Sequence, residues 1–567
     1  MSDVASWRMA LVLAALPIVV LLVLIMSPWP RRWLPMPAHG ALLLAALLAY
    51  GIQVVFIQAG NAGEASSRMI HAAVIDGVLT ALTPLAIVFG AVLLFKTLEI
   101  SGAMGVLTAR LRVLSPDPVA QLVLVGWAFS FLIEGLSGFG TPAALAAPVL
   151  VGLGFPPVRV AAMCLIMNSV PVPFGAVGTP VWFGLGELDL SPEQLLSIGF
   201  KSAAINAAAA LLIPLLALRV VLPWSVIRPR LRFVYLVILA TVTPFAITAL
   251  WSVEFPSIIG GVAGLLIGSA AARLGLGLPT HDAHSPETKP NSQTQPRLCL
   301  AVLPLLGVLV ILAATRIGQV GIKGLLTSDH PAARASLGAL GEAWISPSLV
   351  IGLRDILGTG FAWKMPLLYV PFILPFVVVS LAAIPILRMD RAKVAGVWRE
   401  TIDRLARPAA ALVGALVLVK MFMLGNDHAP AMLIGQAMAQ ASGSSWALVA
   451  PLLGALGSFF SGSNTVSNLT FAPVQAAAAD SLSLNLTGLL ALQTVGGAMG
   501  NMVCIHNIVA VAAVLGLRDA TALSAVPTID GDSPDPGGVA AILRLTAGPM
   551  AAYALIAAAV GGLAMAV

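Results

Sequence analysis

The stretch FLIEGLSGFGTPAALAAPVLVGLGF (131–155) decides the fold, because a polar, Gly-rich break interrupts an otherwise apolar helix. The stretch FFSGSNTVSNLTFAPVQAAAA (459–479) has the same order of half-helix, break and half-helix. Each is followed by a second broken apolar stretch, AAMCLIMNSVPVPFGAVGTP (161–180) and LLALQTVGGAMGNMVCIHNIV (489–509). Non-helical backbone in hydrocarbon is tolerated only where it is buried in protein or lines a wet cavity. Two matched pairs of breaks therefore predict a polar cavity inside an apolar bundle.

The composition around these breaks is that of a membrane protein. Of 567 residues, 59% are hydrophobic and 10% are charged, whereas about a quarter are charged in soluble domains. The mean hydropathy of +0.99 excludes a water-soluble globule. Runs such as 9–25 and 366–387 are long enough to cross about 30 Å of hydrocarbon as helices. We therefore predict an all-α polytopic membrane protein whose partner is the lipid bilayer, and we read its net charge of +6 as loop bias rather than nucleic-acid binding.

The spans and the charges between them predict how the chain is organised. Apolar spans are expected near 9–28, 40–58, 72–95, 198–220, 232–250, 257–272, 298–315, 366–387, 409–424 and 545–566. The expected divisions are N-terminal scaffold spans (1–70), a first repeat (71–220), intervening spans (221–408) with a polar linker at 279–296 and an external loop at 316–364, and a second repeat (409–567). Lys and Arg gather on one side of this topology, which predicts that both termini are periplasmic.

The two broken regions are expected to form an inverted repeat. A span that ends in Lys96 precedes the first region, and a span that carries Lys420 precedes the second. The predicted topology runs these spans in opposite directions. Inverted repeats with paired broken helices are typical of secondary transporters that bind substrate near the bilayer midplane. The alternative is that Gly and Pro at the breaks serve helix packing alone.

Small polar side chains and free backbone N–H groups at the breaks predict a binding site for a carboxylate. Thr141 and Thr179 each precede a proline, which is typical of a helix start, and helix starts attract anions. Asparagines at the breaks donate hydrogen bonds to a carboxylate or hydroxyl, or they satisfy the broken backbone instead. The candidate substrate-binding residues are Gly138, Gly140, Thr141, Asn168, Ser461, Ser463, Asn464, Thr465, Ser467, Asn468 and Gln493.

Four titratable residues are candidates for handling protons or charge. Glu134 ends an apolar half-helix, where a carboxylate is costly, and His506 lies within an apolar segment. Each is a candidate proton carrier, with a structural hydrogen bond as the alternative role. Lys96 and Lys420 are candidates for compensating the charge of an anion, with snorkelling at span ends as the alternative. The three cysteines lack metal-ligand spacing, so neither a metal nor a cofactor is expected.

At these breaks the chain resembles the lactate permease family of bacterial proton symporters. The matching stretches are EGLSGFGTP (134–142), LVGLGF (150–155), the run 164–178, SGSNTVSN (461–468) and GGAMGNM (496–502). The Ser-Asn-Thr within the fourth stretch also resembles the hairpin-tip signature of the wider ion-transporter superfamily. This resemblance implies uptake of L-lactate, D-lactate or glycolate with protons across the bacterial inner membrane.

The resemblance also implies an architecture. That architecture has a scaffold and a moving transport domain, and two re-entrant hairpins and two unwound helices form the site. The hairpins would be 119–154 and 446–480, and the unwound helices would be 159–186 and 488–516.

The chain departs from some family members, which carry Asp in place of Asn464, Lys in place of Asn501, and Ser-Pro-Gln in place of 504–506. These departures leave open which acid is carried and which residue carries the proton. A sodium-coupled carrier of carboxylates or dicarboxylates is the alternative within the same class. An intramembrane serine hydrolase is a distant alternative that rests on Gly-Leu-Ser-Gly at 135–138. We expect a transporter rather than an enzyme, and a homo-oligomer is left open.

Overall fold

The computed structural model describes residues 2–26, 38–59, 64–113, 115–138, 141–279, 297–316, 321–425, 428–515, 517 and 538–566. The chain divides into two compact units, each built from two separate stretches of sequence. Unit 1 comprises Met1–Leu107 and Gln293–Gln440, and unit 2 comprises Thr108–Ser292 and Ala441–Val567. The predicted grouping into scaffold and transport domain concerns motion, so it stays a prediction.

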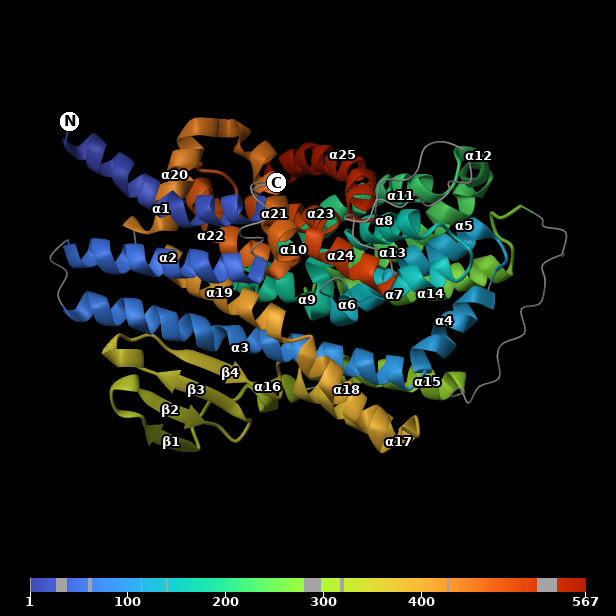
Figure 1. The fold of residues 1–567 in the computed structure, drawn as a ribbon, viewed down its shortest axis with the longest axis horizontal. Helices are drawn as coiled ribbons and strands as arrows, with labels where there is room; N and C mark the ends of the chain where they lie inside the picture. Colours follow the sequence, from blue (N-terminus) through green and yellow to red (C-terminus); the bar gives the residue numbers. More distant parts are fainter. Residues whose placement is uncertain are drawn as a thin grey trace. The chain divides into compact units, whose positions relative to one another are not determined.

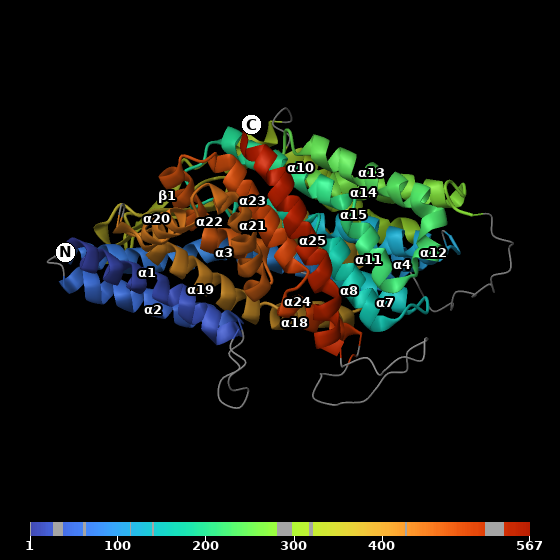
Figure 2. The same cartoon turned by 90° about the horizontal axis from the view of Figure 1, so that it is seen from above.

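Unit 1 is built around the long helix α3 (Glu64–Ile100). Its other helices are α1 (Ser2–Met26), α2 (Ala38–Ala59), α15 (Leu298–Arg316), α16 (Ile322–Thr327), α17 (Val379–Ile386), α18 (Arg391–Asp403) and α19 (Ala406–Met423). The π-helix η7 (Ile373–Val378) leads into α17. Helices α2 and α19 pack along α3, as Figures 1 and 2 show. Two helices, α4 (Ala103–Val113) and α20 (Pro430–Ser442), cross the boundaries between the units.

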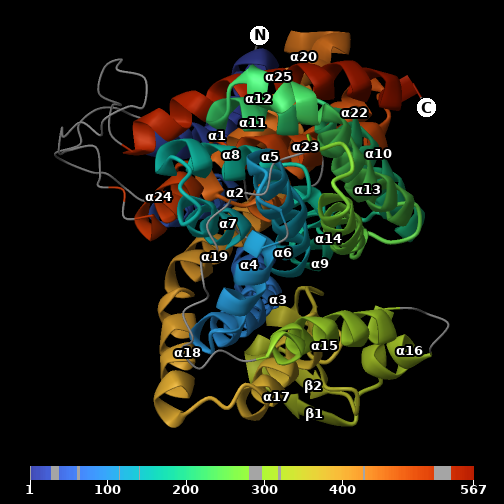
Figure 3. The ribbon, with the colours of Figure 1, turned by 90° about the vertical axis from the view of Figure 1, so that its right-hand side faces the viewer.

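Unit 1 also contains a small antiparallel sheet, which the sequence analysis did not predict. Its strands are β1 (Ala333–Ser336), β2 (Glu342–Ile345), β3 (Val350–Arg354) and β4 (Trp363–Pro366), in the order β1-β2-β3-β4. The sheet follows α15 and α16 in the chain (Figure 3). The segment 316–364, expected as an exposed loop, therefore includes folded structure. Strands of four or five residues are too short to stand out in a hydropathy profile, which explains the difference.

One cross-strand contact shows how this sheet holds together. Trp344 on β2 lies opposite Gly352 on β3. A Cβ atom at Gly352 would lie 2.4 Å from the indole ring, so only glycine leaves room for it. The guanidinium of Arg354 stacks over the same ring, 4.8 Å from its centroid. Burial of one aromatic ring and a cation–π contact thus stabilise the sheet.

Unit 2 contains the broken regions. Its first stretch forms α5 (Pro118–Gln121), the π-helix η1 (Leu122–Phe129), α6 (Ser130–Ser137), α7 (Thr141–Val151), α8 (Pro157–Asn168), η2 (Val172–Phe174), α9 (Gly175–Trp182), α10 (Pro192–Ala210), α11 (Ile213–Val221), α12 (Trp224–Ile227), η3 (Arg228–Arg230), α13 (Leu231–Thr248) and α14 (Pro256–Arg273). Its second stretch forms α21 (Trp446–Ser461), α22 (Asn464–Leu482), α23 (Leu486–Asn501), α24 (Ile505–Val514) and α25 (Gly538–Ala566). The predicted linker lies almost entirely outside the described residues.

Close backbone approaches fix the first broken helix against α14. A Cβ atom at Gly135 on α6 would lie 2.7 Å from the backbone nitrogen of Ile258 on α14. A Cβ atom at Gly261 would lie 2.4 Å from the backbone nitrogen of Leu132. Small residues on both helices therefore let them approach closely, as is common where helices pack in membranes.

Seven helices in the described part of the chain are long and apolar enough to cross a membrane, or up to nine if two bent pairs count as one span each. One bent pair is Pro157–Asn168 with Val172–Trp182, which turns by 65°. The chain is therefore a mostly helical, multi-pass membrane protein, and this part of the prediction is confirmed.

Candidate functional site

Two helix breaks lie where the sequence predicts interruptions. Helix α6 ends at Ser137, and Gly138 follows with a φ of 61°, a conformation that favours glycine. Helix α21 ends at Ser461, and Gly462 follows with a φ of 72°. The hydroxyl of Ser463 then accepts a 3.3 Å hydrogen bond from the backbone N–H of Val466, which caps the start of α22.

Two predicted residues at the first break lie wholly or partly outside the described residues. Gly140 lies outside the described residues, and Thr141 begins α7 but its side chain lies outside them.

A strained turn interrupts the third element of the site. Inside α9, Ala176, Val177 and Gly178 have φ values of 44°, 58° and 73°. Two of the three are not glycine, and valine is strongly disfavoured in this left-handed region. The turn is held by side chains that follow it, because the Thr179 hydroxyl donates to the Ala176 carbonyl and the indole of Trp182 donates to the Val177 carbonyl at 2.9 Å. Such strain persists only where surrounding contacts impose it, and it is common at functional sites.

These breaks meet at one pocket inside unit 2. The pocket is lined by Glu134, Gly138, Val172, Gly175, Ala176, Pro180, Gly462, Ser463, Asn464, Thr465 and Asn501. Stretches far apart in the sequence therefore meet there, and five predicted residues (Glu134, Gly138, Ser463, Asn464 and Thr465) line it together. We call this the break pocket.

Glu134 supplies the carboxyl group of the break pocket. Its side chain is 2% exposed, and Oε2 accepts a 3.0 Å hydrogen bond from Nδ2 of Asn168. The other oxygen lies against Gly175, where a Cβ atom would be only 2.3 Å from Oε1. A buried carboxyl with one amide partner and a neighbouring glycine is thus placed in the pocket wall.

Three asparagines present oxygen atoms that lack a partner. The Nδ2 of Asn464 donates to the Thr494 carbonyl at 3.0 Å, and the Nδ2 of Asn468 donates to the Pro180 carbonyl at 2.9 Å. Because those partners are acceptors, the orientation of each amide is fixed. The Oδ1 atoms of Asn168, Asn464 and Asn468 are buried and accept no hydrogen bond within the described structure. A buried acceptor without a hydrogen bond costs about 1–3 kcal/mol. Of the three asparagines, Asn464 lines the break pocket, so a donor on a molecule bound there would stabilise its Oδ1.

Three other predicted ligands contact protein groups instead. Ser461 Oγ donates to the Gly457 carbonyl at 2.8 Å and accepts from the Ser463 N–H, so it shapes the turn. Ser467 Oγ donates to the Gly454 carbonyl at 2.6 Å, and Nε2 of Gln493 donates to the same hydroxyl at 3.2 Å. Ser467 and Gln493 thus connect α21, α22 and α23. They do not line the break pocket, and their role in reading a substrate stays a prediction.

The remaining titratable candidates are not in this pocket as described. His506 belongs to α24, but its side chain lies outside the described residues. Lys96 and Lys420 belong to unit 1, where each forms an ion pair with a carboxylate. Compensation of substrate charge by these lysines also stays a prediction.

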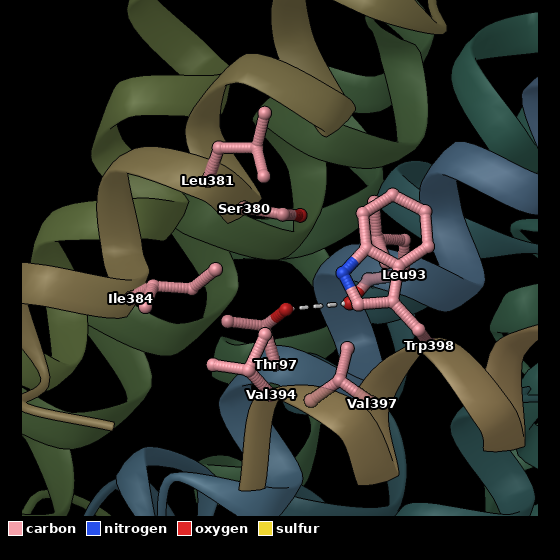
Figure 4. A pocket seen from close by; sticks show the side chains of 8 residues that line it. All are labelled: Leu93, Thr97, Ser380, Leu381, Ile384, Val394, Val397 and Trp398. Carbon is pink, nitrogen blue, oxygen red and sulfur yellow. Dashed lines mark hydrogen bonds between the residues drawn. The ribbon is translucent and has the colours of Figure 1, made fainter. Parts of the chain in front are cut away.

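A second pocket lies in unit 1 (Figure 4). It is lined by Leu93, Thr97, Ser380, Leu381, Ile384, Val394, Val397 and Trp398. The Thr97 hydroxyl donates to the Leu93 carbonyl at 2.8 Å, and the Ser380 hydroxyl is buried with no partner within the described structure. None of these lining residues carries a charge, so this pocket is a poorer candidate for binding an anion than the break pocket.

Several residues of the break pocket were not predicted from the sequence. Val172, Gly175, Ala176 and Pro180 approach it because of the left-handed turn. Asn501 was noted as a departure from the family pattern, yet it also lines the pocket, and Nδ2 of Asn507 donates to its Oδ1. The repeated Gly and Pro in the stretch FGAVGTP (174–180) are the signal that could have indicated this turn.

Comparison with known proteins agrees with a membrane carrier. A family model described as L-lactate permease matches residues 10–522. A Haemophilus influenzae protein provisionally named an L-lactate permease is 42% identical, over 90% of this chain and 93% of its own. The Escherichia coli proteins named L-lactate permease and glycolate permease GlcA are 27% and 25% identical, over 79% and 87% of this chain and 81% and 93% of theirs.

Proposed function

Because this chain belongs to the L-lactate permease family, we propose that it takes up a small 2-hydroxy monocarboxylate with protons across the bacterial inner membrane. L-lactate is the first candidate substrate, and D-lactate or glycolate is the next. The names of the relatives support these acids, since they include lactate and glycolate permeases. Permease relatives also indicate a transporter rather than an enzyme.

One observation carries this proposal. A helix start, a buried carboxyl and an amide with an unpartnered oxygen line a single pocket, through Ser463, Glu134 and Asn464. The helix start suits the carboxylate of a hydroxy acid, the amide oxygen suits its hydroxyl group, and the buried carboxyl suits the proton that travels with it. The pocket wall is built from helix breaks, which is where transporters place their substrates.

The substrate carboxylate would bind at the start of α22. The first N–H groups of a helix lack intrahelical acceptors, and the helix dipole is positive at this end. Ser463 already caps one of these groups, and Thr465 lies one residue beyond the start of the helix. The remaining N–H groups and the Thr465 hydroxyl would hold the anion, as helix starts do elsewhere.

The substrate hydroxyl would donate to an asparagine oxygen. The amide nitrogens of Asn464 and Asn168 each donate one hydrogen bond, to a carbonyl and to Glu134, whereas their Oδ1 atoms accept none within the described structure. Of the two, Asn464 lines the break pocket. A 2-hydroxy acid brings the hydroxyl donor that these acceptors need. An acid without that hydroxyl, such as propionate, would leave these acceptors without a hydrogen bond. The site should therefore bind hydroxy acids more tightly than propionate.

Glu134 would carry the proton, with His506 as the other candidate. Moving one uncompensated charge costs about 2.3 kcal/mol per 100 mV of membrane potential. A proton that travels with a monocarboxylate removes that charge. The buried carboxyl beside the substrate position makes Glu134 the first candidate for this role.

The region beside the same pocket also suits sodium as the coupling ion in place of the proton. The unpartnered Oδ1 of Asn464 and the unpartnered hydroxyl of Ser458 both lie beside Gly497, where a Cβ atom would be 1.8 Å and 3.2 Å from them. Neutral oxygens in this arrangement suit a hard cation, so sodium coupling is the alternative.

Uptake by the purified protein in liposomes tests both versions. Labelled lactate and glycolate would be offered under an imposed pH gradient, a sodium gradient, or neither. We expect accumulation with the pH gradient alone, whereas accumulation with the sodium gradient alone would favour the alternative.

Glu134→Gln should abolish proton-driven accumulation and leave exchange of labelled for unlabelled substrate, because exchange needs no net proton movement. Asp480→Asn, at the exposed end of α22, is the matched control.

Accumulation under neither gradient would contradict symport altogether. Wild-type accumulation by Glu134→Gln would instead exclude Glu134 as the proton carrier and turn attention to His506. The expected periplasmic position of both termini can be tested separately, by protease access to epitope tags on the two termini in cells that express the protein.

A further inference from the structure

Two ion pairs in unit 1 join α3 to α18 and α19. The ammonium of Lys420 lies 2.7 Å from Oδ2 of Asp76, with side chains 14% and 6% exposed. The ammonium of Lys96 lies 2.7 Å from Oε2 of Glu400, with side chains 3% and 47% exposed. Lys96 also contacts Glu99 on its own helix. Lys96, Asp76 and Lys420 are thus mostly buried, whereas Glu400 is about half exposed. Buried charged groups in a membrane protein almost always have a partner or a role.

The two ion pairs are reciprocal. At the level of Asp76 the acid belongs to α3 and the base to α19, whereas at the level of Lys96 the base belongs to α3 and the acid to α18. Residue numbers rise along α3 from Asp76 to Lys96 while they fall along the partner from Lys420 to Glu400. The helices are therefore antiparallel, and Gly396 beside Ile100 continues the same register. Twenty residues separate the two levels, which is about 30 Å at the helical rise.

One sequence offset relates the two pairs. Glu400 follows Asp76 by 324 residues, and Lys420 follows Lys96 by 324 residues. Adding 324 to the number of Asp76 gives Glu400, and subtracting 324 from the number of Lys420 gives Lys96. The offset therefore converts one ion pair into the other. Any two contacts in one antiparallel register share an offset in this way. The exchange of acid and base between the two helices is the further feature that a two-fold axis produces between equal partners.

The same offset reaches the helix breaks of unit 2. It relates Ser137, the last residue of α6, to Ser461, the last residue of α21. It also relates the left-handed Gly138 to the left-handed Gly462. The two ion pairs of α3 and the two helix breaks of unit 2 are therefore related by the same offset of 324 residues. Helices that pack independently would have no reason to share it.

We propose that the two reciprocal ion pairs are one interaction made twice within the inverted repeat that the sequence predicts, in which α3 and α18–α19 are the equivalent helices. In this role Lys96 and Lys420 are positioning residues that hold the first helices of the two repeats together. They do not contact the substrate. The inference goes beyond the proposed substrate and coupling ion, and it holds for any cargo.

The physics of buried ion pairs makes the proposal testable. Removing one partner leaves an uncompensated buried charge, whereas removing or exchanging both partners does not. Asp76→Asn and Lys420→Met should each lower the Tm of the detergent-purified full chain and the yield of monodisperse protein. The exchange Asp76→Lys with Lys420→Asp should recover most of both losses, and it should recover uptake in liposomes.

The second pair gives an independent repetition. Lys96→Glu with Glu400→Lys should recover stability in the same way, provided that Glu99→Gln removes the acid that would face the new carboxylate. The mismatched combination Asp76→Lys with Glu400→Lys is the control, because it places like charges together at both levels. It should be less stable than either exchange.

Two results would overturn the proposal. Single substitutions that keep the Tm, lose uptake, and are not recovered by exchange would mean that the lysines act on the substrate. Recovery at one pair and none at the other would mean that the pairs are not equivalent. Because Tm and yield are measured without substrate, a failure of the proposed function would leave this test intact.

Discussion

The amide nitrogen Nδ2 of Asn168 donates a 3.0 Å hydrogen bond to Oε2 of Glu134, which lies 34 positions earlier in the chain. Asn168 is the last residue of α8, and Glu134 lies in the last turns of α6. The bond therefore joins the helix break after α6 to the bent helix pair of α8 and α9. It leaves Oδ1 of Asn168 without a donor and Oε1 of Glu134 against Gly175.

We predict that Asn168→Asp impairs uptake strongly. The substitution places a second carboxyl beside a buried one, and two carboxyls in one site do not both ionise readily. It also removes the amide donor of Glu134. Initial rates of lactate uptake across a range of pH would measure the effect. Asn485→Asp is the control, because Asn485 caps α23 with a side-chain oxygen that Asp also provides. Unchanged rates for Asn168→Asp would show that the contact has no part in transport.

We predict that Gly175→Ala also impairs uptake, by moving the carboxyl of Glu134. The new methyl group would lie 2.3 Å from Oε1, which is well inside van der Waals contact, so the carboxyl must shift. The backbone at Gly175 is extended with a φ of −63°, so alanine adds no backbone strain there. Gly562→Ala on α25 is the matched control, since nothing lies within 4 Å of its added Cβ atom. The measurement is uptake together with Tm, and a lower Tm with normal uptake would contradict the prediction.

The sequence indicates the helix breaks at Gly138 and Gly462 because the residues there act locally. Gly138 and Gly462 adopt positive φ at little cost, and Ser463 caps the next helix with its own hydroxyl. Such features need only neighbouring residues, so they are visible in a short stretch. The breaks therefore lie where they were expected, and four of the eleven candidate ligands (Gly138, Ser463, Asn464 and Thr465) line the pocket together with Glu134.

The left-handed turn at Ala176 and Val177 was not foreseen, because both residues disfavour it. Distant and downstream contacts impose it, among them Trp182 and the close approach of Val253 to Gly178. The partners of Lys96 and Lys420 were equally hidden, because each lies on another helix far along the chain. Lysine near a span end gives the same local signal whether it snorkels or pairs. Tertiary contacts of this kind leave no pattern in the sequence of one chain.

The sheet of unit 1 yields a prediction about pH. Lys364 lies 3.0 Å from Asp329, and its charge and hydrogen bond lower the pKa of this exposed carboxyl. A lowered pKa means that the ion pair contributes above the ordinary Asp value of about 3.9, and that the contribution is lost as the pH falls through the folded pKa. Lys364→Ala should therefore raise the pKa of Asp329 toward its ordinary value, measured by NMR titration. Because the pair is exposed, uptake near neutral pH should not change.

The last prediction concerns the strained turn. Trp182→Phe keeps the ring but removes the indole N–H that donates to the Val177 carbonyl. A typical hydrogen bond contributes about 0.5–1.5 kcal/mol, so the Tm should fall modestly. Uptake should fall more than stability, because the released turn carries Gly175 and Ala176, which line the break pocket. Trp251→Phe is the control, since this tryptophan is 56% exposed. If Trp182→Phe lowered the Tm and left the uptake rate and the apparent KM for lactate unchanged, the turn would hold the fold without shaping the site.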